Sequence, residues 1–203
     1  MKRIALSILL CTLFGTAQAA TSSITIDNQS TVNFSGYDGQ PKDVTGTKAQ
    51  GFFGALRTTV AGTFYATYLG NESGYVNSFT LTSVGTPSLL ETNTVGKTIS
   101  SLVGPGLVGF SFSDNQGATF SNGQAQTNTL GFAILSGITK TQGTFDYVLG
   151  FNDSYSSDAD YDDFVVGVKF IATPVPEADT SAMMLLGLGL MGFIARRRKN
   201  NQA

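Results

Sequence analysis

One segment of the sequence concentrates carboxylates that could bind a metal ion. Five aspartates fall within eleven residues: Asp153, Asp158, Asp160, Asp162 and Asp163. Like charges at this spacing repel one another, so the segment needs a cation or solvent to screen them. Calcium is the natural partner because it is a hard ion that takes oxygen ligands. Two interpretations stay open: an irregular calcium site, or an exposed acidic turn whose aspartates accept hydrogen bonds from backbone N–H groups.

The spacing of these aspartates does not match an EF-hand. Counted from Asp158, the sixth position holds Asp163 where that loop needs glycine, and the twelfth holds Lys169 where it needs a bidentate glutamate. A further carboxylate, Glu72, lies in an Asn-Glu-Ser-Gly turn. A solvated loop explains Glu72 adequately, although it could also ligate a metal or bind sugar.

Most catalytic chemistry lacks its usual residues. The chain has no histidine, which is the commonest general base and a frequent zinc ligand, and its one cysteine is Cys11. A hydrolase that uses two carboxylates stays formally open, but most of the clustered acids share one segment, whereas a catalytic pair comes from facing elements. No Ser-x-x-Lys pair follows the first 19 residues. We therefore expect a protein that is not an enzyme.

The charge distribution argues against nucleic acid as a partner. Six of the twelve basic residues stand in the two end segments, which leaves six against twelve acids from Asp27 to Asp163. This central region is near −6 and has no basic stripe to neutralise phosphates. The absence of tryptophan also removes the usual sugar-stacking residue.

The elements that must position these residues look like strands. Short alternating apolar runs are interrupted by Gly, Asn, Asp and Pro, which is strand rather than helix spacing. We predict an all-β domain, an antiparallel β-sandwich that is jelly-roll-like. The expected strands are residues 23–27, 31–35, 56–60, 63–69, 78–84, 97–102, 107–113, 129–135, 145–151 and 164–171.

The first 19 residues have the pattern of a signal peptide. Lys2 and Arg3 precede an apolar stretch from residue 4 to residue 14, and Ala17-Gln18-Ala19 forms a small-x-small cleavage site. We expect signal peptidase to cut before Ala20. The secreted β-sandwich domain would then cover residues 20–172.

The other end combines three features in a fixed order. Residues 173–181 contain Thr173-Pro174-Val175-Pro176-Glu177, a Pro-Glu motif in an extended linker. An apolar run from Ala182 to Ala195 follows, and Arg196, Arg197, Arg198 and Lys199 come next. We predict a C-terminal transmembrane helix and Arg-rich tail over residues 182–203, with the basic cluster as a cytoplasmic stop-transfer signal. The run is about 14 residues long, below the roughly 20 that span a bilayer comfortably.

This order of features resembles the PEP-CTERM sorting signal, with Val175, Pro176 and Glu177 as the motif and Ala178 where a second proline is usual. The resemblance implies an exosortase substrate of a Gram-negative bacterium. It further implies cleavage near Pro176-Glu177, an inner-membrane-anchored intermediate, and delivery to the cell surface or extracellular matrix of a biofilm.

The middle of the chain has two local patterns. One is Gly70-x-Glu72-x-Gly74-Tyr75-x-Asn77, and the other is the aspartate segment with Tyr161 at its centre. Together they resemble secreted sandwich domains that often precede a PEP-CTERM tail, a resemblance that implies no particular activity. The leading hypothesis is a non-enzymatic cell-surface or exopolysaccharide-matrix protein. The alternative is a calcium-dependent carbohydrate or surface-ligand binding module.

Overall fold

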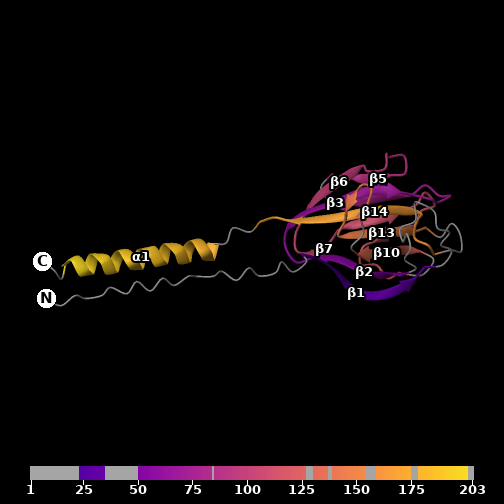
Figure 1. Ribbon diagram of the computed structural model, residues 1–203. Coiled ribbons are helices and arrows are strands. Elements are labelled where there is room, and N and C mark those ends of the chain that lie inside the picture. Colours follow the sequence, from indigo (N-terminus) through magenta and orange to yellow (C-terminus); the bar gives the residue numbers. More distant parts are fainter. Residues whose placement is uncertain are drawn as a thin grey trace.

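The computed structural model describes residues 23–34, 50–83, 85–126, 130–136, 139–153, 159–174 and 178–200. The predicted signal peptide, with Ala17 and Ala19 at its cleavage site, lies outside these residues. Within them, the strands lie between Ile24 and Ala172, and a helix follows (Figure 1). The predicted antiparallel β structure and C-terminal helix are confirmed, because every strand pairing is antiparallel.

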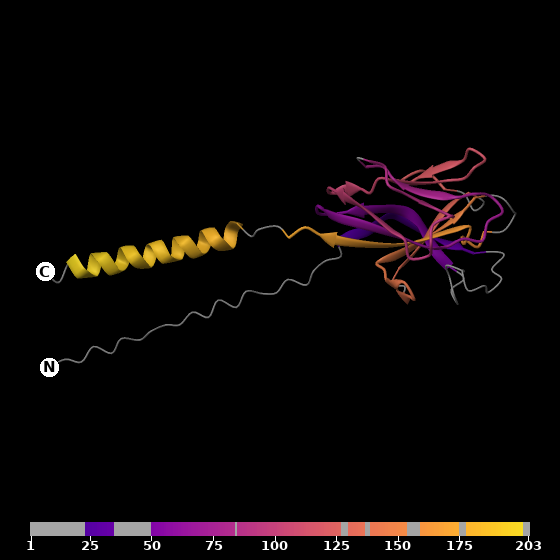
Figure 2. The same cartoon turned by 90° about the horizontal axis from the view of Figure 1, so that it is seen from above.

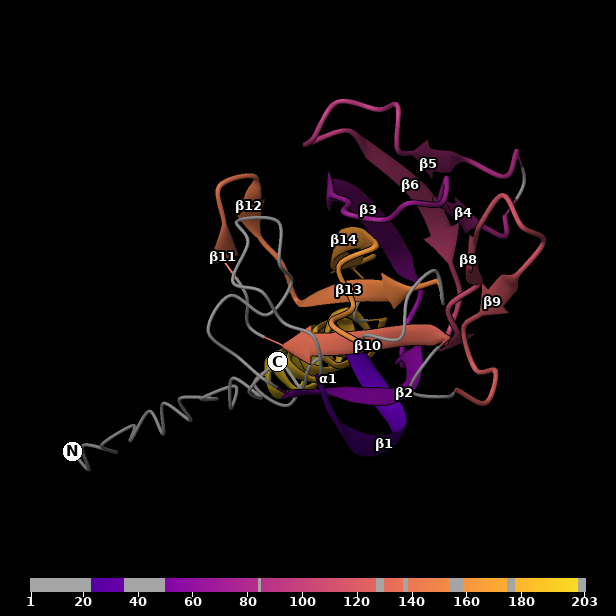
Figure 3. The same cartoon turned by 90° about the vertical axis from the view of Figure 1, so that its right-hand side faces the viewer.

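The larger sheet has eight strands in the order β1-β2-β10-β13-β14-β3-β6, with β7 also paired to β2. Figure 3 shows these strands fanning from β6 to β1. Strand β14 lies inside this sheet, between β13 and β3, and is buried along most of its length. The bounds are β1 Ile24–Asn33, β2 Gln50–Thr58, β3 Gly62–Gly70, β6 Thr98–Val103, β7 Gly106–Leu107, β10 Gly131–Ser136, β13 Tyr147–Asn152 and β14 Phe164–Ala172.

The smaller sheet has four strands in the order β5-β4-β8-β9 and packs against one face of the larger sheet. Its strands are β4 Ser78–Leu81, β5 Ser88–Leu90, β8 Phe110–Ser113 and β9 Thr119–Ser121. A separate short hairpin, β11 Thr139–Lys140 and β12 Gly143–Thr144, projects from the larger sheet (Figure 2). The jelly-roll topology predicted from the sequence stays a prediction.

Phenylalanine rings hold the two sheets together. Phe112 of the smaller sheet stacks on Phe151 of the larger one with centroids 4.9 Å apart, and Phe110 lies edge-on to Phe132 at 5.4 Å. All four rings are at most 1% exposed. Aromatic pairs add packing energy beyond the burial of their area, so this layer supplies a disulfide-free core.

The outer face of the larger sheet carries two further apolar clusters. In one, the ring of Phe145 covers Gly167 so closely that a Cβ at Gly167 would meet ring atoms at 2.7 Å. In the other, Tyr161 is fully buried beside Phe34 and Phe53, with ring centroids 5.1 and 6.0 Å away. Tyr161 thereby fixes residues 159–163 onto the sheet.

Several predicted strand boundaries are wrong. The predicted strands 23–27 and 31–35 both fall on one strand, β1 (Ile24–Asn33), because a bulge between Asp27 and Ser30 carries the chain through what looked like a turn. The predicted strand 107–113 is two strands, since the chain passes from β7 in the larger sheet to β8 in the smaller one. The short strands β5, β9, β11 and β12 were not predicted.

Candidate functional site

The C-terminal tail begins where the sheet ends. Strand β14 pairs with β3 up to Ala172, which lies opposite Gly62, and the backbone N–H of Thr173 donates to the carbonyl oxygen of Ala61 at 2.9 Å. The helix α1, Ala178–Asn200, follows and stands away from the β structure (Figure 1). Only residues 174–177 lie between the last hydrogen bond of the sheet and the helix.

The described apolar side chains of α1 are exposed, from Met183 at 70% to Ile194 at 47%. Arg196, Arg197 and Arg198 are exposed near its end, and the side chain of Lys199 lies outside the description. No helix among the described residues is both long enough and apolar enough to cross a membrane. The transmembrane helix predicted over residues 182–203 is therefore corrected to an exposed apolar helix, since its uninterrupted apolar run has about 14 residues.

The aspartate segment is more buried than an exposed turn would be. Asp153 and Asp162 are 0% and 3% exposed, while Asp160 and Asp163 are half-buried. Asp158 lies outside the described residues. Asp163 Oδ2 accepts a hydrogen bond from the backbone N–H of Asp153 at 2.8 Å. The hydrogen bond from a backbone N–H group that the acidic-turn interpretation expects is thus present for Asp163. The exposure that this interpretation expects is wrong for Asp153 and Asp162, whose side chains are buried.

Asp153 joins this segment to the turn that precedes β4. Its Oδ2 accepts a hydrogen bond from Asn77 Nδ2 at 2.6 Å and another from the Ser73 hydroxyl. Asn77 Nδ2 also approaches the carbonyl oxygen of Asp163 at 3.4 Å. The two sequence patterns, 76 to 86 residues apart in these contacts, therefore form one polar cluster. We call it the Asp153 cluster and define it as Ser73, Asn77, Glu91, Asp153 and Asp163.

Glu91 enters the Asp153 cluster through the backbone. Its Oε1 accepts a hydrogen bond from Asn77 N at 2.7 Å. Burial raises the pKa of Glu91 above its ordinary value, the hydrogen bond from Asn77 lowers it, and the charge of Asp153 raises it. Burial also raises the pKa of the Tyr68 hydroxyl to about 12, with a further contribution from the charge of Glu91. Negative charge thus gathers in a partly dehydrated site.

One buried oxygen in the Asp153 cluster lacks a hydrogen bond. Asn77 is 0% exposed, and its Oδ1 has no partner among the described residues. Buried polar atoms are nearly always paired, so such an atom needs an explanation, and a bound ion is one. The described residues contain no group of three or more carboxylate, histidine or cysteine side chains arranged to hold a metal.

Sequence reasoning named the aspartates but missed their partners Ser73, Asn77 and Glu91. The signal for two of them was present, because both Ser73 and Asn77 stand in the turn pattern from Gly70 to Asn77. Glu72, the carboxylate singled out in that turn, is exposed. The pattern did not show that this turn contacts Asp153.

The comparisons with known proteins identify the tail. The family model described as the PEP-CTERM protein-sorting motif matches residues 174–199. This confirms the resemblance found in the sequence and indicates a surface protein that an exosortase sorts. The chain therefore carries a PEP-CTERM protein-sorting motif over these residues. Val175, Pro176 and Glu177 lie within the matched range but outside the described residues.

The comparisons stop at the tail. Searches among curated proteins and among solved structures gave no match to the chain.

Proposed function

We propose that this protein is a non-enzymatic component of the cell surface or exopolysaccharide matrix, delivered there through its PEP-CTERM motif. The observation that carries the proposal is the motif match at residues 174–199, which begins two residues after strand β14 ends. Four residues at about 3.5 Å each span at most roughly 14 Å. An enzyme that cuts near Pro176-Glu177 would therefore work close to the folded sheet.

The proposed route has three steps. Signal peptidase removes residues 1–19 during export. The apolar side chains of α1 then keep the intermediate at the inner membrane. Exosortase finally cuts near Pro176-Glu177 and releases the β domain to the surface or matrix.

The non-enzymatic part of the proposal rests on composition. The chain has no histidine, and its single cysteine, Cys11, lies in the segment that signal peptidase would remove. Carboxylates are therefore the main groups left for acid-base chemistry. The carboxylates that the structure places together, Asp153 and Asp163, accept hydrogen bonds from amide and backbone donors of the same cluster.

Disruption of the exosortase gene in the source bacterium tests the sorting step. The wild-type protein should move from surface to membrane fraction, and should keep its C-terminal peptides there. A truncated chain that ends at Thr173 is the matched control, because it keeps the final hydrogen bond of the sheet but lacks the motif. Its location should not depend on exosortase. Equal surface delivery of the wild-type protein with and without exosortase would contradict the proposal.

A second candidate function is a calcium-dependent carbohydrate or surface-ligand binding module. The buried Oδ1 of Asn77 favours it, because this atom lies on the amide whose nitrogen is 2.6 Å from the Asp153 carboxylate. Rotation of the amide by a half-turn would present its oxygen beside Asp153, an arrangement that a cation would stabilise. Carboxylate, amide and backbone carbonyl oxygens are the ligands that calcium uses.

Titration calorimetry of the purified protein with calcium and with magnesium tests this second function. Binding of calcium should be lost in Asp153→Asn and retained in Asp27→Asn, a carboxylate in a surface ion pair with Arg57. Absence of calcium binding by the wild-type protein would remove the module and leave the sorting proposal intact.

A further inference from the structure

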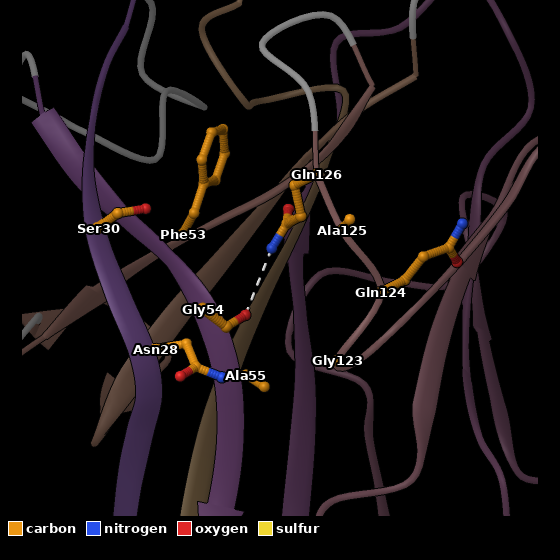
Figure 4. A pocket seen from close by; sticks show the side chains of 9 residues that line it. All are labelled: Asn28, Ser30, Phe53, Gly54, Ala55, Gly123, Gln124, Ala125 and Gln126. Atoms are coloured by element: carbon orange, nitrogen blue, oxygen red, sulfur yellow. Dashed lines mark hydrogen bonds between the residues drawn. The ribbon is translucent and has the colours of Figure 1, made fainter.

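A polar groove of about 310 Å³ lies beside β2, on the side of the molecule where β1 and the chain after β9 approach each other (Figure 4). Its volume is near the lower end of the range for small-molecule sites, so it suits one small unit of a ligand. The lining residues are contributed by β1, β2 and the segment 123–126: Asn28, Ser30, Phe53, Gly54, Ala55, Gly123, Gln124, Ala125 and Gln126.

The first wall of the groove is the bulge in β1. Between Asp27 and Ser30 the strand takes up extra residues, and Asn28 adopts a left-handed backbone with φ of 53°. Asparagine tolerates this conformation better than most residues, and such outliers gather at functional sites. Gly54 opposite permits the bulge, because a Cβ there would lie 2.5 Å from Ile26 Cγ2 and 2.7 Å from the carbonyl oxygen of Asp27.

The second wall is held by two side-chain amides, which form hydrogen bonds with backbone groups of the strands. Asn122 Oδ1 accepts from Leu56 N at 2.9 Å, and its Nδ2 donates to the carbonyl oxygens of Leu56 and Val108, both at 2.8 Å. Gln126 Oε1 accepts from Phe132 N at 2.7 Å, and its Nε2 approaches the Gly54 carbonyl oxygen at 3.4 Å. The segment between them is therefore fixed at both ends, and the groove is preorganised.

The groups that face the groove are neutral. None of its lining side chains is charged. Among the described residues nothing hydrogen-bonds the side chains of Asn28 or Ser30, and Gln124 uses only its Oε1, which accepts from Ser121 N at 3.2 Å. Two amides and a hydroxyl thus remain to donate and accept, and the Phe53 ring adds an apolar surface at one end.

We propose that this groove binds one unit of a neutral oligosaccharide. A sugar ring offers several hydroxyl groups, which act as donors and acceptors toward amide and hydroxyl side chains, and it has C–H faces that pack on an aromatic ring. A charged ligand would find no counter-charge in the lining and would meet a domain whose acids outnumber its bases. The inference rests on the matrix association proposed above and names the ligand class for it.

A glycan array of neutral and uronate-containing oligosaccharides, probed with the full chain in detergent, tests the ligand class. The protein should bind neutral glycans in preference to acidic ones. Titration calorimetry with the best neutral glycan then measures affinity for a double variant, Asn28→Gly with Gln124→Ala. Glycine keeps the left-handed backbone at position 28 while the amide is lost. Loss of two hydrogen-bonding groups should weaken binding roughly tenfold.

The matched control is Asn115→Gly with Gln116→Ala, an exposed Asn-Gln pair in the turn between β8 and β9 that does not line the groove. It should bind as the wild type does. Ser30→Ala, a change at one exposed hydroxyl, gives a second measurement if the double variant does not fold, and it should weaken binding about threefold.

Three results would overturn the proposal: no neutral glycan bound, a preference for acidic glycans, or equal loss of affinity in the groove variant and its control. A preference for acidic glycans would leave matrix association standing. Failure of exosortase processing would contradict the sorting proposal without changing the array result.

Discussion

Replacement of Asn77 by alanine should destabilise the protein strongly, because Asn77 supports a buried carboxylate. Asn77 is 0% exposed, and its Nδ2 donates at 2.6 Å to Asp153, which is also 0% exposed. A hydrogen bond to a charged group contributes about 1.5–3 kcal/mol, and truncation also leaves the carboxylate less well solvated. We expect a loss of about 3 kcal/mol in the free energy of unfolding, which corresponds to roughly 6–12 °C in melting temperature for a domain of this size.

Thermal unfolding followed by far-ultraviolet circular dichroism measures this loss. The matched control is Asn115→Ala, because Asn115 is exposed and its Oδ1 accepts a longer bond from Val76 N, at 3.2 Å. Its cost should stay within about 0.5 kcal/mol. Asn77→Asp separates charge from packing: it places a second carboxylate beside Asp153, so its stability should recover on acidification as one proton is taken up. Equal melting temperatures for Asn77→Ala and Asn115→Ala would refute the reasoning about the Asp153 cluster.

Three further predictions concern calcium, pH and the tail. Calcium at about a hundredfold excess over its dissociation constant should add roughly 2.7 kcal/mol to stability, and scanning calorimetry should show this shift in the wild type but not in a variant with Asp160→Ala and Asp162→Ala. The pKa of Glu91 is raised in the folded state, so as the pH falls the folded protein takes up a proton on Glu91 before the unfolded chain does. The stability that this proton contributes is present at acid pH and is lost as the pH rises through the pKa of Glu91 in the folded state. Denaturant unfolding of Glu91→Gln should therefore show less loss of stability than the wild type between acid and neutral pH, and parallel profiles would contradict this. Replacement of residues 196–199 by serine should let the protein pass through the inner membrane, as fractionation would detect, whereas unchanged retention and processing would show that the cluster does not act as a stop-transfer signal.

The central strands could be predicted from the sequence because their side chains alternate or are apolar throughout. Predicted residues 63–69 and 164–171 correspond to β3 and β14, which pair with each other inside the larger sheet. The break between β7 and β8 could not be predicted, since nothing local marks the residue where a chain changes sheets. Gly109 is the nearest sign: a Cβ there would lie 2.5 Å from Thr82 Oγ1.

The β1 bulge was misread for a physical reason. Asn28 is a common turn residue, and its left-handed backbone is a turn conformation, but here the strand resumes its pairing with β2 at Ser30. Gly54 on the neighbouring strand makes room for this bulge. Local propensity cannot report such a long-range accommodation.

The candidate site was half predictable. The five nearby aspartates are evident in the sequence. The burial of Asp153, however, depends on hydrogen bonds from Ser73 and Asn77, which lie 80 and 76 residues away in the sequence. Asp27, which looked isolated, forms an ion pair with Arg57 at 2.5 Å across the β1–β2 ladder. The charge pattern of the sequence thus located the acidic segment, whereas its hydrogen-bond partners could be identified only from the folded structure.

The most direct test of the central claim, sorting through the tail, is intact-mass spectrometry of the protein recovered from the cell surface of the source bacterium. The account predicts a chain that starts at Ala20 and ends near Pro176-Glu177, without α1 and without Arg196 to Lys199. A surface protein that still carries the helix and the basic cluster would contradict it.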